Sequence, residues 1–154
     1  MVAAADLTFV LDENLGGAIP QVLQVARFPP VGRITTLHEL GFPRGLGVLD
    51  PEWLSKLGQA DHYVGVTRDG RILSTAAQAG AWSGSGLRLF LLAKAWGQLP
   101  RPELVRAMTY WWPSIVAYAE AGAAGTAWTV PPQVPPPGAK GIRLVTGWAL
   151  PTGD

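Results

Sequence analysis

Three oxygen-bearing side chains follow a short apolar run near the start of the chain. Asp12, Glu13 and Asn14 come directly after "LTFVL" and precede two glycines. An acidic side chain at the end of a buried strand is costly unless it is paired or lies at a site. Two more aspartates stand out, Asp50 before "PEWL" and Asp69 after "YVGVTR". Converging carboxylates repel one another unless a cation lies between them, so these residues suggest an oxygen-ligated divalent metal, Mg²⁺ or Mn²⁺.

Two of these aspartates also have a purely structural interpretation. Asp50 precedes Pro51 at the start of an expected helix, where an aspartate commonly caps the first turn. Asp69 precedes Gly70, and Asp-Gly is a common turn pair. Both alternatives stay open at this point. Asp12 is the hardest to explain without a site, because it follows a buried strand.

The elements that must position these acids alternate along the chain. Short β-rich runs predict strands at residues 7–11, 32–37, 62–67 and 87–93. Helical spacing and end signals predict helices at residues 17–28, 50–58, 71–80 and 101–122. Pro113 should kink the last helix or divide it in two. Alternation of this kind predicts an α/β fold with a parallel sheet and helices on both faces, whose ligands bind beyond the carboxyl ends of the strands.

The C-terminal part of the chain has a different composition. Five of the nine residues of "VPPQVPPPG", residues 130–138, are proline, which excludes a helix or a central strand. Residues 126–130 and 141–146 are candidate short strands on either side. We therefore divide the chain into a main domain, residues 1–125, and a proline-rich arm, residues 126–154. The arm either belongs to the same domain or contacts a partner.

Composition limits the classes of protein to which the chain can belong. The 154 residues fit one domain, with 48% apolar and 15% charged residues. No apolar run approaches the roughly 20 residues that span a bilayer, and the N-terminus lacks the basic region of a secretory signal. We therefore expect a cytoplasmic protein without membrane contact. The chain has no cysteine, which excludes disulfides and thiolate zinc sites.

Charge is unevenly distributed along the chain, although the formal net charge is only +1. Residues 1–67 carry four basic and seven acidic side chains, whereas residues 68–106 carry six basic and two acidic ones. A site that holds cations beside a bound polyanion needs such a pattern. Ordinary solvated surface also produces it.

Several of these motifs, taken in order, resemble the PIN-domain nucleases. "FVLDENL", then "HELG" followed by "LDPEWL", then "YVGVTRDGRIL" are similar to the PIN-like branch that begins with "DEN" and is grouped with the VapC toxins. The similarity covers roughly residues 7–120. It implies a three-layer α/β/α sandwich with a mostly parallel sheet, a Mg²⁺ or Mn²⁺ site of acidic side chains, and hydrolysis of single-stranded RNA. It also implies the toxin of a type II toxin–antitoxin pair, with a small antitoxin protein as partner.

The resemblance assigns the acidic residues position by position. Asp12, Asp50 and Asp69 match three family aspartates that hold the metal. The remaining family acid, a glutamate, is matched best by Glu39 and next by Glu13. These five residues are therefore the expected catalytic set.

One position departs from the family pattern. Related sequences often carry an acidic residue where this chain has Arg71. The alternative function is therefore a catalytically impaired PIN-like module that binds RNA or protein.

Other side chains are candidates for contact with RNA. Asn14 would touch the substrate or a metal ligand, and Thr67 would bond an acidic neighbour or end its strand. Three arginines are candidates to hold phosphates, namely Arg68, Arg71 and Arg88. Trp82, in a glycine-rich loop, is the one tryptophan expected to stack on a base.

The adjacent aromatic pair Trp111 and Trp112 leads to a further expectation. Together with the 48% apolar content, this pair predicts that the chain forms a homodimer.

Overall fold

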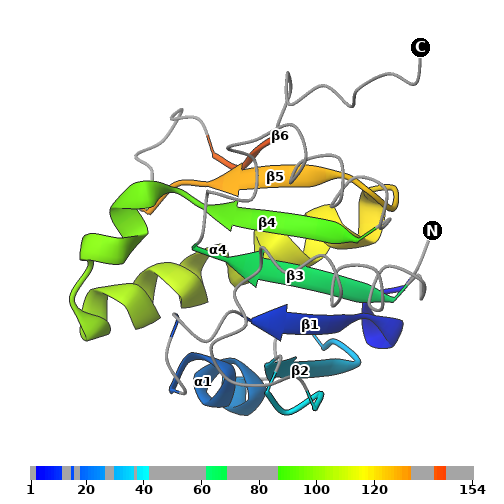
Figure 1. Cartoon of the computed structure of the whole chain (residues 1–154), viewed down its shortest axis with the longest axis horizontal. Coiled ribbons are helices and arrows are strands. Elements are labelled where there is room, and N and C mark those ends of the chain that lie inside the picture. Colours follow the sequence, from blue (N-terminus) through cyan, green and yellow to red (C-terminus); the bar gives the residue numbers. More distant parts are fainter. Residues whose placement is uncertain are drawn as a thin grey trace.

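In the described part of the chain, six strands form one mostly parallel sheet (Figure 1). The computed structural model describes residues 3–11, 15, 18–26, 30–36, 38–41, 62–68, 87–132 and 141–144. The strands are β1 (Thr8–Leu11), β2 (Arg33–Thr36), β3 (Tyr63–Thr67), β4 (Arg88–Leu92), β5 (Ala127–Val130) and β6 (Arg143–Leu144). They lie in the order β2-β1-β3-β4-β5-β6, and each neighbouring pair is parallel except β5 and β6. The expected α/β class with a mostly parallel sheet is confirmed.

The strands form where the sequence predicts them, because their composition suits a sheet buried on both faces. Strands β1 and β4 are buried at every position, which explains why they appear in the sequence as continuous apolar runs. The two candidate strands around the proline-rich segment are also present, as β5 and β6. Strand β5 pairs with β4, so this part of the arm is built into the sheet.

Helical segments precede β1 or lie between the described strands. They are η1 (Ala4–Asp6), α1 (Ala18–Ala26), η4 (Lys94–Gln98) and α4 (Arg101–Ala121). Helix α1 has Pro20 in its first turn, as predicted, where the missing amide donor costs no helical hydrogen bond. The helices expected at residues 50–58 and 71–80 lie outside the described residues.

Helix α4 runs unbroken from Arg101 to Ala121 with Pro113 inside it. The prediction that Pro113 could divide this segment into two helices is therefore wrong. Pro113 is exposed, whereas Trp112 and Ile115 on either side of it are buried. Apolar packing of both halves of the helix outweighs the loss of one amide donor.

One face of the sheet packs against α4 and α1 in a single apolar cluster. Phe9 of β1 meets Trp112 of α4 edge to face, with ring centroids 4.7 Å apart. Phe90 of β4 stacks on Trp128 of β5, also at 4.7 Å. The opposite face is buried as well, since Leu89 on that face has no exposed surface. Burial of both faces is what a three-layer α/β/α arrangement requires.

The adjacent tryptophans belong to the interior of the same chain. Trp111 is 4% exposed and Trp112 is 2% exposed, and both lie in the cluster between α4 and the sheet. The pair therefore does not form a surface for a second subunit. The tryptophan pair no longer supports the expectation of a homodimer.

No helix in the described part of the chain is both long and apolar enough to cross a membrane.

Candidate active site

The carboxyl ends of the parallel strands meet at one edge of the sheet, where the arrowheads of β1, β3, β4 and β5 point in Figure 1. The chain passes from β1 to β2 on one side of β1 and later to β3 on its other side. This order places the topological switch point between β1 and β3, the position where open α/β sheets bind their ligands. Leu11 is level with Val66 of β3 and with Thr36 of β2, so three strand ends lie side by side.

Glu39 lies at this edge, in the turn that follows β2. Its carboxylate Oε2 accepts a hydrogen bond from Thr35 Oγ1 at 2.8 Å, and its backbone N–H donates to Thr36 Oγ1 at 3.2 Å. Gly41 closes the turn with a φ of 98°, a conformation that favours glycine. Thr35 thus holds the exposed carboxylate of Glu39, and Thr36 holds its backbone, beside the end of β1. The remaining lone pairs of the carboxylate can accept further bonds or ligate a cation.

Thr67 and Arg68 mark the end of β3 at the same edge. Thr67 is fully buried and level with Leu91 of β4, as a strand-terminal residue inside the sheet should be. Arg68 follows it and is half-buried. Among the predicted phosphate contacts, Arg68 is the one that the described structure places at the carboxyl edge.

Arg88 lies at the opposite edge of the sheet, near the amino end of β4, where it is level with Val64. Its side chain is 3% exposed, and its Nε donates to the carbonyl oxygen of Gly122 at 3.1 Å. Arg88 thus ties β4 to the end of α4. This position gives no support to the prediction that Arg88 holds substrate phosphates, and we leave it out of the proposed site.

The other predicted site residues lie outside the described residues. They are Asp12, Glu13, Asn14, Asp50, Asp69, Arg71 and Trp82. Within the described ranges, no group of three or more His, Cys, Asp or Glu side chains could hold a metal ion. Their assignment as ligands or contacts therefore stays a prediction.

Thr35 also belongs to this edge, and nothing in the sequence indicates it. Thr35 has no exposed surface and looks like an ordinary strand residue, so only its bond to Glu39 reveals the role. A threonine four residues before an acidic residue is a common pattern, so the sequence gives no signal of this hydrogen bond.

The comparison with protein families agrees with this geometry. The model of the PIN-like domain family matches residues 7–94, a stretch that includes β1, β2, β3 and β4. The chain belongs to the PIN-like domain family, whose superfamily consists of nucleases. No curated protein and no solved structure matches the chain.

Proposed function

We propose that this protein is a Mg²⁺- or Mn²⁺-dependent endoribonuclease that cleaves single-stranded RNA at the carboxyl edge of its sheet. The observation that carries the proposal is the pairing of β1 with both β2 and β3, which places three strand ends together at the switch point. Candidate acids follow all three of these strand ends in the chain.

Two of these acids come directly after described residues of this edge in the sequence. Asp12 follows Leu11 directly, and Asp69 follows Arg68 directly. Leu11 and Arg68 both lie at this edge, and on this proposal the aspartates that follow them lie there too. Glu39 supplies the third carboxylate, next to β1. On this proposal Asp50 joins them from the connection between β2 and β3.

The available donors suit a hard divalent cation. The chain has no cysteine, and carboxylate oxygens are the ligands that Mg²⁺ and Mn²⁺ accept. Such a cation, when bound, supplies a water that is nucleophilic at neutral pH and offsets charge on the phosphoryl oxygens. We assign Asp12, Asp50 and Asp69 to hold it.

The remaining residues of the proposed site orient the water and the RNA. Glu39, or Glu13 in its place, completes the acidic set or orients the attacking water, and Thr35 keeps the Glu39 carboxylate in position. Arg68 and Arg71 hold phosphates. Asn14 contacts the substrate, and Trp82 stacks on a base.

We further propose that the chain is the toxin of a type II toxin–antitoxin pair, on the strength of its "DEN" motif. The partner is a small antitoxin that covers the carboxyl edge. A second candidate function is a PIN-like module that binds RNA or protein without cleaving it, and the specific feature that favours it is Arg71.

Cleavage assays with an Asp12→Asn variant test the enzymatic proposal. Wild type with Mg²⁺ should cleave single-stranded RNA, and chelator or Asp12→Asn should lower the rate by about 100-fold or more. Asp6→Asn is the matched control, because Asp6 is an exposed aspartate in η1, before the amino end of β1. It should cleave like wild type.

The possible results separate the candidate functions. Equal RNA breakdown by wild type and Asp12→Asn, with Mg²⁺ and with chelator, would overturn metal-dependent catalysis at Asp12. RNA binding without cleavage by the folded wild type would favour the binding module.

A further inference from the structure

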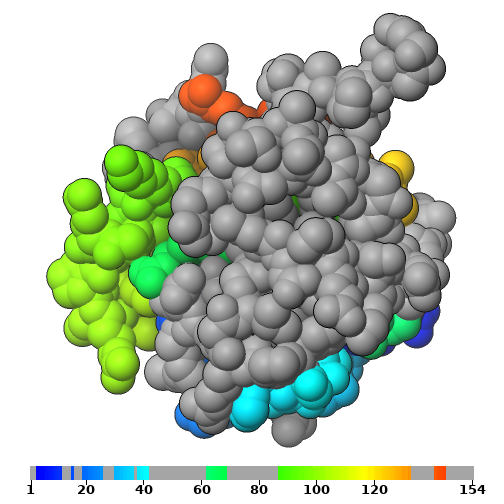
Figure 2. Space-filling view, viewed as in Figure 1, coloured from blue at the N-terminus to red at the C-terminus, as the bar shows by residue number. Residues whose placement is uncertain are grey.

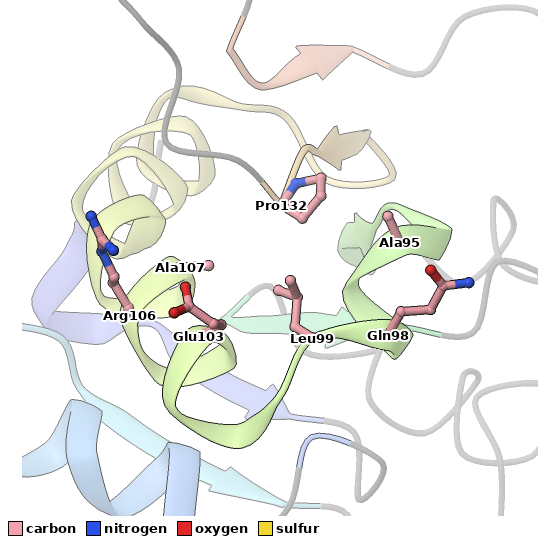
Figure 3. Close-up of a pocket in the computed structure, with 7 residues that line it drawn as sticks. All are labelled: Ala95, Gln98, Leu99, Glu103, Arg106, Ala107 and Pro132. Carbon is pink, nitrogen blue, oxygen red and sulfur yellow. The ribbon is translucent and has the colours of Figure 1, made fainter.

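A hollow lies at the carboxyl edge, beside the ends of β4 and β5. It is a cavity of about 480 Å³ between η4, the first turns of α4 and the segment after β5 (Figure 3). This volume falls within the range of about 300–1,000 Å³ that is typical of small-ligand sites. Figure 2 shows that the surface around η4 and the start of α4 is exposed at this end of the molecule.

The lining of this cavity combines an apolar centre with polar groups at its sides. Leu99 and Pro132 face each other across it, and Gln98 and Arg106 lie on opposite sides (Figure 3). Flat, partly apolar groups with polar edges, such as nucleobases, fit a lining of this kind. Leu99 and Pro132 would cover the faces of a base, and the Gln98 amide would reach its polar edge.

Hydrogen bonds hold the walls of the cavity in place. The carbonyl oxygen of Val130, at the end of β5, accepts from Ala93 N at 3.0 Å and from Trp96 Nε1 at 2.9 Å. Trp96 has no exposed surface, and its carbonyl oxygen accepts from Leu99 N at 3.2 Å. The segment η4 is thus tied to β5 before any ligand binds, which limits the entropy lost on binding.

The surface around the cavity is basic. Arg106 and Glu103 are its two charged lining residues and offset one another. Lys94 and Arg101 are exposed beside it, on η4 and at the start of α4, and favour an anionic ligand at its rim. The ends of β4 and β5, beside the cavity, lie two strand spacings along the sheet from the β1–β3 switch point, an offset of roughly 10 Å within the sheet. One strand of nucleic acid can therefore reach both places.

We propose that this cavity is a subsite that binds one nucleoside of the RNA strand, a few nucleotides away from the bond that is cleaved. The base lies between Leu99 and Pro132, and Gln98 contacts its edge. Arg106 contacts an adjacent phosphate. This inference rests on the proposed function, because it takes single-stranded RNA as the ligand.

Binding measurements in chelator test the subsite without requiring cleavage. The probe is a fluorescein-labelled single-stranded RNA of about 12 nucleotides, a length within the usual site sizes of single-strand binding folds. Its Kd is measured by fluorescence anisotropy. Arg106→Gln should raise the Kd about 5- to 20-fold, and Gln98→Ala about 3-fold. Both positions are exposed, so the fold should be unaffected.

Arg33→Gln is the matched control, because it removes the same charge from an exposed residue at the amino end of β2. Its Kd should stay within about 2-fold of wild type. Inorganic polyphosphate, which has charge but no base, serves as a second probe. Gln98→Ala should leave its affinity unchanged, since this side chain contacts the base.

The subsite and the proposed function fail in different ways. Wild-type RNA affinity in both Arg106→Gln and Gln98→Ala would overturn the subsite, whatever the cleavage assay shows. Weaker RNA binding by these variants, in a protein that never cleaves RNA, would support the subsite and overturn the nuclease. If Arg33→Gln weakened RNA binding as much as Arg106→Gln, the effect would be one of net charge alone. That result would also overturn the subsite.

Discussion

Replacing Gly122 with alanine should destabilise the protein, although the change is small. Gly122 follows the last residue of α4 with a φ of −81°, which alanine also adopts without strain. A Cβ at this position would overlap the Trp128 ring, with Cζ2 at 2.5 Å, and would lie 2.9 Å from the carbonyl oxygen of Tyr118. Real Cβ atoms essentially never come so close to another heavy atom. Either the indole or the end of α4 must move.

Both movements are energetically unfavourable. Trp128 is 4% exposed and stacks on Phe90 with an interplanar angle of 14°, a contact that is worth about 0.5–1.5 kcal/mol beyond the buried area. The Gly122 carbonyl also accepts the hydrogen bond from Arg88. Overpacking of this kind lowers the free energy of unfolding by about 1–3 kcal/mol. Alanine also lowers the entropy of the unfolded chain, which raises the free energy of unfolding by about 0.4–1 kcal/mol. We expect a net loss of about 1–2 kcal/mol in the free energy of unfolding.

Gly97→Ala is the matched control, because the chemical change is the same. Gly97 is exposed in η4, and no described atom lies within 4 Å of its added Cβ. The free energy of unfolding of Gly97→Ala should equal that of wild type or exceed it by up to about 1 kcal/mol. Urea denaturation followed by far-UV circular dichroism measures both variants against wild type. If Gly122→Ala proved as stable as Gly97→Ala, the close approach of α4 to β5 described above would be refuted.

Two further substitutions test the core and the candidate site. Trp112→Ala removes the ring that packs on Phe9 and should cost about 3–5 kcal/mol, measured by the same denaturation; a loss below about 1 kcal/mol would contradict its burial. Thr35→Val removes the hydrogen bond to Glu39 while keeping the shape of the side chain, and should slow RNA cleavage about 10-fold or more without changing RNA affinity. Unchanged cleavage by the folded variant would exclude a role for Thr35 in positioning Glu39.

The secondary structure could be predicted from the sequence because its causes are local. The apolar runs of β1 and β4 and the helical spacing of α1 depend on neighbouring residues only. The same is true of the order of elements, from which a parallel sheet follows. Of the two outcomes predicted for Pro113, a kink or a division into two helices, the division did not occur, because tertiary packing on both sides of it kept α4 continuous.

The place of individual side chains could not be predicted in the same way. Nothing near Arg88 in the sequence distinguishes an arginine that binds phosphate from one that is buried, since its partner Gly122 is 34 residues away. Trp111 and Trp112 could equally have formed a subunit interface, and only their packing in the core decided between the two.

The sequence alone determined the α/β class, the strands and the acids that are candidates for metal binding. Tertiary structure decided that β1 lies between β2 and β3, which brings Glu39 beside the end of β1. It also decided that Leu99 and Pro132, far apart in the chain, line one cavity. The physical reason is that sheet pairing and cavities arise from contacts between distant residues, whereas secondary structure is encoded in short, local patterns.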